Sequence, residues 1–148
     1  MDVGFFVVIG TFAAFTIAGL WRSTRPERPS AIPATMPTTP LGLERYCAEA
    51  LRDLGWRAEL TAASGDQGVD VLARKGRVSL VVQCKFYGKP VGNEAVQQAL
   101  AGRMFTGATH AAVVSNQSYT RSAQDLAQRT GVLLLAPEDL RRADALFR

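Results

Sequence analysis

Histidine and cysteine are scarce in this sequence, which holds one histidine and two cysteines among 148 residues. A structural zinc site needs several such ligands at short spacing, and none of Cys47, Cys84 and His110 lies in a motif of that kind. A disulfide framework also needs more cysteines, and both cysteines fall where we expect core-facing positions. We therefore expect two buried free thiols in a reducing compartment and no zinc site.

Charge is missing from one long stretch near the N-terminus. No charged residue occurs from Val3 to Trp21. A helix of that length rises about 28 Å, close to the thickness of the hydrocarbon core of a bilayer. Only Met1 and Asp2 precede it, so the basic region of a cleavable signal peptide is missing as well. We predict a transmembrane helix over residues 3–21.

The flanking charges predict the orientation of this helix. Three arginines follow it between residues 22 and 28, whereas Asp2 precedes it. The positive-inside rule then predicts a single-pass membrane protein whose C-terminal part lies on the cytoplasmic side. Small residues recur at every fourth position from Gly10 to Ala18 and could let two such helices pack as a homodimer, although small residues are common in transmembrane helices generally.

Residues 22–42 are rich in proline and carry five of the seven prolines in the chain. Such a segment cannot form a packed core and should sample extended conformations, with a reach of at most about 60 Å. We predict a linker over 22–42 and one globular domain over 43–148. The formal net charge of +4 permits a polyanionic partner without requiring one.

Hydrophobic periodicity predicts alternating helices and strands in the domain. We expect an α/β fold in which a mixed sheet is flanked by helices. In the second helix, we expect Val96, Ala99, Leu100 and Met104 to point inward. The expected helices span residues 43–54, 93–105, 120–131 and 137–147, and the expected strands lie at 56–61, within 69–87, at 111–115 and at 132–135.

A β-hairpin is predicted between residues 69 and 87, where two apolar strands flank a short basic turn. Three polar side chains interrupt these strands. Asp70 lies near the start of the hairpin, and Gln83 and Lys85 lie near its end. Charged side chains are rarely buried without a partner, so their presence in apolar strands needs an explanation.

Strand geometry predicts that the three side chains share one face of the sheet. Gln83 and Lys85 do so because side chains alternate along a strand. A two-residue loop at Lys75-Gly76, or a four-residue loop around it, places Asp70 opposite Val81 and about 7–8 Å diagonally from Gln83. A slip of one residue would move Asp70 to the other face.

The helix predicted at residues 43–54 offers one more carboxylate. Glu44 lies at the border of its apolar stripe, about 75° from the centre of the stripe. Glu49 lies nearly opposite the stripe and should face solvent. Glu44 is therefore the helix residue that we expect to join the polar patch of the hairpin.

These residue types suit metal-assisted hydrolysis of a phosphodiester. Asp70, the amide oxygen of Gln83 and the backbone carbonyl of Cys84 could bind Mg²⁺, because hard cations prefer oxygen ligands. Lys85 could orient and help deprotonate the attacking water, or neutralise charge on the phosphorane. In the alternative interpretation, Lys85 extends to solvent beside Tyr87 and Asp70 only caps a strand.

Five stretches of the sequence together resemble the Mrr-type restriction endonuclease domain, a branch of the PD-(D/E)xK nuclease superfamily. The resemblance implies a restriction-endonuclease-like fold and a Mg²⁺-dependent endodeoxyribonuclease with no small-molecule cofactor. It implies Asp70, Gln83 and Lys85 as catalytic residues and Glu44 as the helix carboxylate. Most of the superfamily has Asp or Glu where this chain has Gln83, and the Q-x-K form is that of the Mrr-like branch. The stretches are G-D-Q-G-V-D-V (65–71), V-Q-C-K-F-Y (82–87), V-G-N-E-A-V-Q (91–97), V-V-S-N (113–116) and Y-T-R-S-A-Q-D-L-A (119–127).

DNA is the expected partner, and Gln67, Lys89 and Arg121 are candidates for contacting it. Each also has a plainer interpretation, as a turn residue or a solvated charge. A restriction enzyme or a DNA-processing nuclease near the membrane is the predicted function. The alternatives are an inactive nucleic-acid-binding or scaffold module, and a nuclease acting on RNA or branched DNA.

Overall fold

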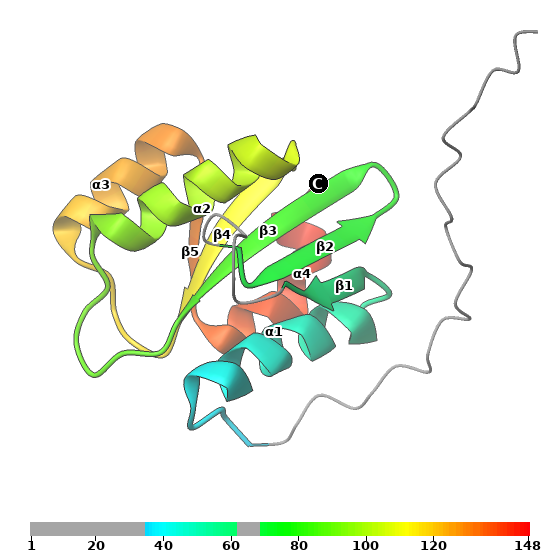
Figure 1. Ribbon diagram of the computed structural model, residues 1–148, viewed down its shortest axis with the longest axis horizontal. Coiled ribbons are helices and arrows are strands. Elements are labelled where there is room, and N and C mark those ends of the chain that lie inside the picture. Colours follow the sequence, from blue (N-terminus) through cyan, green and yellow to red (C-terminus); the bar gives the residue numbers. More distant parts are fainter. Residues whose placement is uncertain (1–34, 62–68) are drawn as a thin grey trace, which may run out of the picture.

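A five-stranded mixed sheet forms the centre of the protein in this computed structural model, which describes residues 35–61 and 69–148. The expected α/β fold, a mixed sheet flanked by helices, is confirmed (Figure 1). The order of elements is α1 (Pro40–Asp53), β1 (Arg57–Leu60), β2 (Val71–Lys75), β3 (Val78–Lys85), α2 (Asn93–Thr106), β4 (His110–Ser115), α3 (Arg121–Thr130), β5 (Leu133–Leu135), the 3₁₀ helix η1 (Pro137–Arg142) and α4 (Ala143–Leu146).

The predicted transmembrane helix at 3–21 lies outside the described residues, as do most of the proline-rich segment and Gln67. Among the helices of the described part, none combines the length and apolar character that crossing a membrane requires.

Strand order in the sheet follows the sequence, β1-β2-β3-β4-β5. The pairs β1–β2 and β2–β3 are antiparallel, whereas β3–β4 and β4–β5 are parallel. Parallel strands end at the same edge of a sheet, so Lys85 at the end of β3 is the register partner of Ser115 at the end of β4. This edge is where ligands bind in open α/β sheets.

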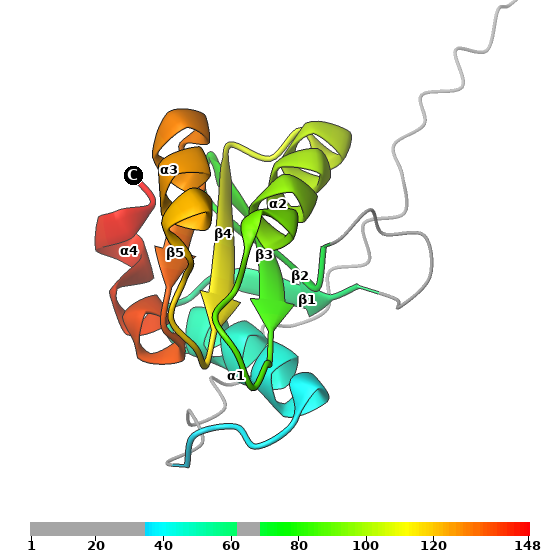
Figure 2. The same cartoon turned by 90° about the vertical axis from the view of Figure 1, so that its left-hand side faces the viewer.

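Helices cover both faces of the sheet (Figures 1 and 2). α1, η1 and α4 pack on one face, around a core that includes Leu43, Leu51 and Leu80. α2 and α3 pack on the other face, around Val81 and Val96. Both connections between the parallel strands run through helices on that second face. Gln83, which shares the face of Val81, therefore points toward the α2 side of the sheet.

The hairpin of β2 and β3 turns one residue later than predicted. Lys75 pairs with Val78, so the two-residue turn is Gly76-Arg77, and Gly76 takes the left-handed conformation with φ +60°. The register therefore differs by two residues from the prediction, which is wrong in placing Asp70 opposite Val81. Because a shift of two keeps every side chain on its face, Asp70 still shares the face of Gln83, and its neighbour Val71 pairs with Val82, the neighbour of Gln83.

Helix α1 begins at Pro40, earlier than predicted. The side chain of Thr39 accepts a hydrogen bond of 3.0 Å from the backbone N–H of Gly42, and proline at the first helical position suits this start. The buried face of α1 also includes Tyr46 and Ala48, so it is wider than the predicted stripe. For this reason Glu49 is half-buried rather than solvent-facing.

Helix α2 buries Val96 and Ala99 as predicted, and Leu100 is partly buried against the same core. Met104 is 77% exposed, so its predicted inward position is wrong. The buried face also includes Ala95 and Gly102, and Met104 lies about 180° around the helix from Ala95. These small residues let the helix approach the sheet closely. The predicted closing helix is also different, since it is a 3₁₀ helix followed by one short α-helix.

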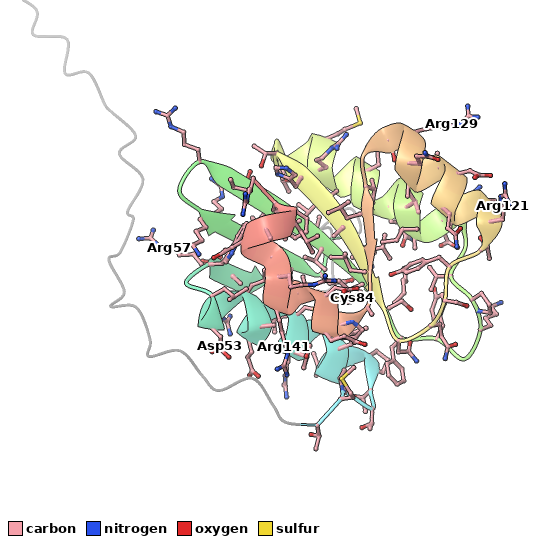
Figure 3. The ribbon with its side chains drawn as sticks, turned by 180° about the vertical axis from the view of Figure 1, so that it is seen from behind. Asp53, Arg57, Cys84, Arg121, Arg129 and Arg141 are labelled. Carbon is pink, nitrogen blue, oxygen red and sulfur yellow. The ribbon has the colours of Figure 1, made fainter. Side chains whose placement is uncertain are left out.

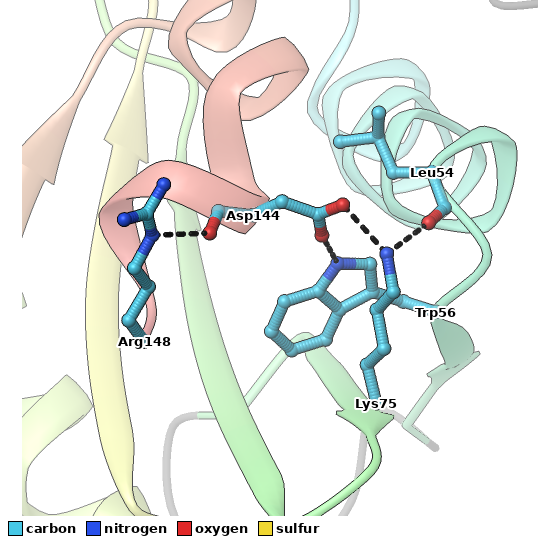
Figure 4. A network of polar contacts seen from close by, with 5 residues as sticks. All are labelled: Leu54, Trp56, Lys75, Asp144 and Arg148. Atoms are coloured by element: carbon cyan, nitrogen blue, oxygen red, sulfur yellow. Dashed lines mark hydrogen bonds and ion pairs between the residues drawn. The ribbon is translucent and has the colours of Figure 1, made fainter.

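A polar network ties the C-terminal segment to the first two strands (Figure 4). The indole N–H of Trp56 donates to Asp144 Oδ1 at 2.8 Å, and Lys75 Nζ donates to Asp144 Oδ2 at 2.6 Å. Lys75 also donates to the carbonyl of Leu54 at 2.6 Å. The contacts with Lys75 and then Trp56 hold the pKa of the Asp144 carboxyl below its usual value. The network therefore stabilises the fold at neutral pH, and this contribution is lost as pH falls through the folded pKa.

Asp144→Ala should lower the free energy of unfolding by about 1 kcal/mol, because the largely buried indole N–H of Trp56 loses its acceptor. This loss of stability is at the low end of the usual range for a buried donor without an acceptor, because Asp144 is half-exposed and solvent screens its ion pair with Lys75. Urea unfolding followed by fluorescence measures it. Asp144→Asn, which keeps an acceptor oxygen, should lose less, and equal midpoints for wild type and Asp144→Ala would contradict this account.

Candidate active site

Asp70 lies at the point where the chain leaves the ladder between β2 and β3. Continuing the register would pair residue 69 with Cys84. Instead, the carbonyl of Val69 accepts from the hydroxyl of Thr61, and the N–H of Cys84 donates to Asp70 Oδ2 at 2.6 Å. The N–H of Asp70 donates to the carbonyl of Val82 at 2.9 Å. Main-chain contacts to β3 thus fix both the backbone and the carboxylate of Asp70.

Gln83 is the buried partner of this carboxylate. Its side chain is 5% exposed, and Nε2 donates to Asp70 Oδ2 at 2.6 Å. Its Oε1 is buried and has no hydrogen-bond partner within the described residues. A buried acceptor left unsatisfied costs about 1–3 kcal/mol, so it marks a place where a further donor or a cation would be favourable.

Lys85 ends β3 on the same face as Gln83 and is half-buried. Its Nζ lies 5.8 Å from the centre of the Tyr87 ring, a distance at which a cation is attracted to the ring. The contact with Tyr87 agrees with the interpretation in which Lys85 extends to solvent beside that ring. The position of Lys85 on the face of Gln83 agrees with the interpretation in which Lys85 is catalytic. Strand alternation therefore puts Lys85 two residues along β3 from Gln83, on the same face of the sheet.

Cys84 points to the opposite face of the sheet, toward α1. Its Sγ lies 3.6 Å from Sγ of Cys47, and both residues are free thiols. The contact with Cys47 raises the pKa of Cys84 well above the usual value, and burial and the negative charges of Asp70 and Glu44 add to the rise. Glu44 lies on α1 and is half-buried.

Asn116 was not predicted as a site residue, but it holds the end of the active strand. Its Oδ1 accepts from the backbone N–H of Tyr87 at 2.9 Å, and its Nδ2 donates to the carbonyl of Tyr87 at 3.0 Å. The side chain thus continues the pairing of β4 with β3 beyond Lys85. The only sequence signal was a polar residue directly after a buried strand.

A cleft of about 770 Å³ lies directly beyond Lys85 along the chain. Residues 87–92 line it, together with Glu94 and Ala95 of α2, and Lys89 is exposed there. Arg121 is elsewhere: its side chain is 90% exposed and pairs with Asp125 at 3.8 Å. Figure 3 shows Arg121 on α3, at the outside of the molecule and away from Cys84. Of the two predicted DNA contacts in the described residues, Lys89 lines this cleft and Arg121 does not.

Oxygen donors dominate the site. In the described ranges, no cluster of three or more His, Cys, Asp or Glu is arranged to hold a metal ion. Any ion bound between Asp70 and Gln83 would therefore rely partly on amide and carbonyl oxygens. That donor set matches hard cations such as Mg²⁺ rather than zinc.

Comparison with known families gives one match over most of the chain. A model of the family Mrr_cat, described as restriction endonuclease, matches residues 36–143. The match includes Glu44, Asp70, Gln83 and Lys85. No protein of curated function matches the sequence.

Solved structures share the fold of the described domain. A protein of unknown function, AF1548, is 20% identical with a TM-score of 0.55, over 70% of this chain and 62% of that one. Protein VC1899 from Vibrio cholerae is 16% identical with a TM-score of 0.55, over 70% of this chain and 32% of that one. At these identities the likeness concerns the fold alone.

The MspJI restriction endonuclease, solved in complex with a 27-mer oligonucleotide, is 28% identical over 66% of this chain and 25% of that one, with a TM-score of 0.46. A TM-score this low carries no weight for the fold. In each of the three comparisons, the match spans less than two thirds of the length of the other protein.

Cys84 should resist alkylation at pH 8, because its raised pKa keeps the thiol protonated and the thiolate is the nucleophile. We expect iodoacetamide to react at least about tenfold more slowly than with a free peptide thiol, and the rate should still be rising above pH 9. Mass spectrometry of the native protein after timed quenching measures this. The urea-unfolded protein is the control, and equal rates in the folded and unfolded states would contradict the expectation.

Proposed function

The chain belongs to the Mrr_cat family of restriction endonucleases, and on that premise we propose that it is a Mg²⁺-dependent endonuclease that hydrolyses phosphodiester bonds in DNA. One observation carries the proposal. The Asp70 carboxylate contacts the amide of Gln83, whose oxygen is buried without a partner among the described residues, and Lys85 follows on the same face. A carboxylate and an amide oxygen can hold a hard cation, and an ammonium can act on the water or the phosphate in metal-assisted phosphodiester hydrolysis.

The residues present fit a magnesium ion. Asp70 and the amide oxygen of Gln83 would hold it, with the backbone carbonyl of Cys84 and the Glu44 carboxylate of α1 as further oxygen donors. The buried and unsatisfied Oε1 of Gln83 supports this assignment. When bound, the ion would polarise the phosphoryl group and lower the pKa of a coordinated water.

The chain's own groups divide the remaining tasks. Two hydrogen bonds hold the Asp70 carboxylate in place, so little reorganisation is needed when substrate arrives. Lys85 Nζ orients the attacking water and takes part in removing its proton, or neutralises charge on the phosphorane. Gln83 supplies an amide where most of the superfamily has a carboxylate, which leaves the centre one negative charge weaker and disfavours a tightly bound second metal.

A second candidate function is an inactive nucleic-acid-binding or scaffold module with the same fold. The Lys85–Tyr87 contact favours it, because an ammonium held over a ring is less available to a phosphate. Metal-dependent cleavage separates the two candidates.

We also propose that residues 3–21 anchor the protein in a membrane as a single-pass helix, with residues 22–42 as linker and the nuclease domain on the cytoplasmic side. The uncharged stretch and the arginines after it support this proposal. Restriction of incoming DNA, or DNA processing near the membrane, is the corresponding role, and two anchors could pair as a homodimer.

Asp70→Asn and Lys85→Ala should each lower Mg²⁺-dependent nicking of supercoiled plasmid by at least about 100-fold, because each removes a group that acts on the reacting phosphate or water. The measurement is the initial rate with purified protein, with and without excess EDTA. Arg129→Ala is the matched control, since it removes an exposed charge from α3, far from the site (Figure 3). Undiminished cleavage by Lys85→Ala would overturn the assignment, whereas wild-type protein without metal-dependent cleavage would support the inactive module.

Deletion of residues 1–21 should move the protein from the membrane fraction to the supernatant of a centrifuged lysate, because the predicted anchor is then lost. Immunoblotting of both fractions measures the distribution. Full-length protein that stays in the supernatant would contradict the anchor. For the restriction role, the same deletion should weaken protection against phage or transforming DNA, and unchanged protection would refute it.

A further inference from the structure

The cleft beyond Lys85 has walls that suit a flat aromatic ligand. Tyr87 is part of the lining and is 40% exposed, and the exposed Pro90 contributes apolar surface. Lys89 and Glu94 are the charged residues of the lining, and they are of opposite sign. A phosphate site would need a net positive lining, so the balance of charge favours an uncharged ring system over a phosphate.

The walls of the cleft are fixed before any ligand arrives. Asn116 holds both backbone groups of Tyr87. The N–H of Val91 donates to the carbonyl of Ser118 at 2.9 Å, and the carbonyl of Val91 accepts from the N–H of Thr120 at 2.9 Å. The loop between β3 and α2 is therefore tied to the loop after β4 at two points. A pre-formed wall loses little conformational entropy when a ligand binds.

The position of Tyr87 links this cleft to the catalytic candidates. The centre of its ring lies 5.8 Å from Lys85 Nζ. A ring stacked on Tyr87 would therefore belong to a nucleotide beside the phosphate that Lys85 contacts. The cleft volume of about 770 Å³ is within the usual range of sites for small ligands, about 300–1,000 Å³.

We propose that the cleft binds one unpaired nucleobase of the DNA substrate, stacked on Tyr87, next to the bond that is cleaved. This inference rests on the proposed nuclease function and specifies its substrate. A base inside a regular duplex must be unpaired and unstacked before it can reach a protein ring, and this cost is least for a base that is already unpaired. The enzyme therefore prefers DNA with an unpaired nucleotide beside the scissile phosphate over a perfect duplex.

The first test compares two substrates with the full-length protein and Mg²⁺. One is a perfect duplex, and the other is the same duplex with one extra unpaired nucleotide. Loss of a base–aromatic stack corresponds to about a 5- to 150-fold change. We expect cleavage beside the unpaired nucleotide to be at least about 5-fold faster in kcat/KM than cleavage of the duplex at the same position.

Variants of Tyr87 assign this preference to its ring. Tyr87→Leu should bring the ratio of the two rates close to one, and Tyr87→Phe should keep the ratio because the ring remains. Phe105→Leu is the matched control, since Phe105 is an exposed aromatic residue at the other end of α2 and is 69% exposed. Equal rates on the two substrates, or an unchanged ratio in Tyr87→Leu, would overturn the inference.

A second test detects the base without cleavage. Iodouracil placed at the unpaired position is irradiated with the protein in excess EDTA, and the adduct is mapped by mass spectrometry. An adduct on Tyr87 supports the base site even if wild-type protein cleaves neither substrate, in which case the nuclease proposal alone fails. Cleavage of the unpaired substrate with no adduct on Tyr87 overturns the base site and leaves the nuclease proposal standing.

Discussion

The hydrogen bond from the backbone of Cys84 to the carboxylate of Asp70 is the contact on which the candidate site depends. The pairing of β2 with β3 ends at Val71 and Val82, so the backbone N–H of Cys84 donates to the Asp70 carboxylate instead of to a strand carbonyl. The carboxylate replaces the missing backbone acceptor, so the contact that ends the strand also fixes the orientation of the acidic side chain. Gln83 then packs against that carboxylate from the neighbouring strand.

The two faces of the sheet contribute differently to the surroundings of this contact. Gln83 and Lys85 point toward α2, whereas Cys84, between them in sequence, points toward α1. Glu44 lies on α1, the helix that packs on the face toward which Cys84 points. Beyond Lys85, the amide of Asn116 continues the pairing with β4 and fixes the wall of the neighbouring cleft. Strand ends therefore position Asp70, Gln83 and Lys85 in the described domain, whereas helix α1 carries Glu44.

Periodicity predicted the faces of the hairpin well and its register poorly. Alternation along β3 is insensitive to an error of two residues, so Asp70 and Gln83 were assigned to one face although the turn lies at Gly76-Arg77. For α2 the prediction is right for Val96 and Ala99 and wrong for Met104. The close packing of this helix selects small residues, whereas the pattern of large apolar residues pointed to Met104. Asn116 was missed because its contact joins positions 29 residues apart, and no local pattern reports such a contact.

The neutral state of Cys84 has a consequence for the sheet behind the candidate site. Contact with Cys47, burial and the nearby carboxylates all raise the pKa of Cys84, so the sulfur stays protonated. The packing of two cysteines between α1 and β3 therefore leaves Cys84 without a negative charge on the face opposite Asp70 and Gln83.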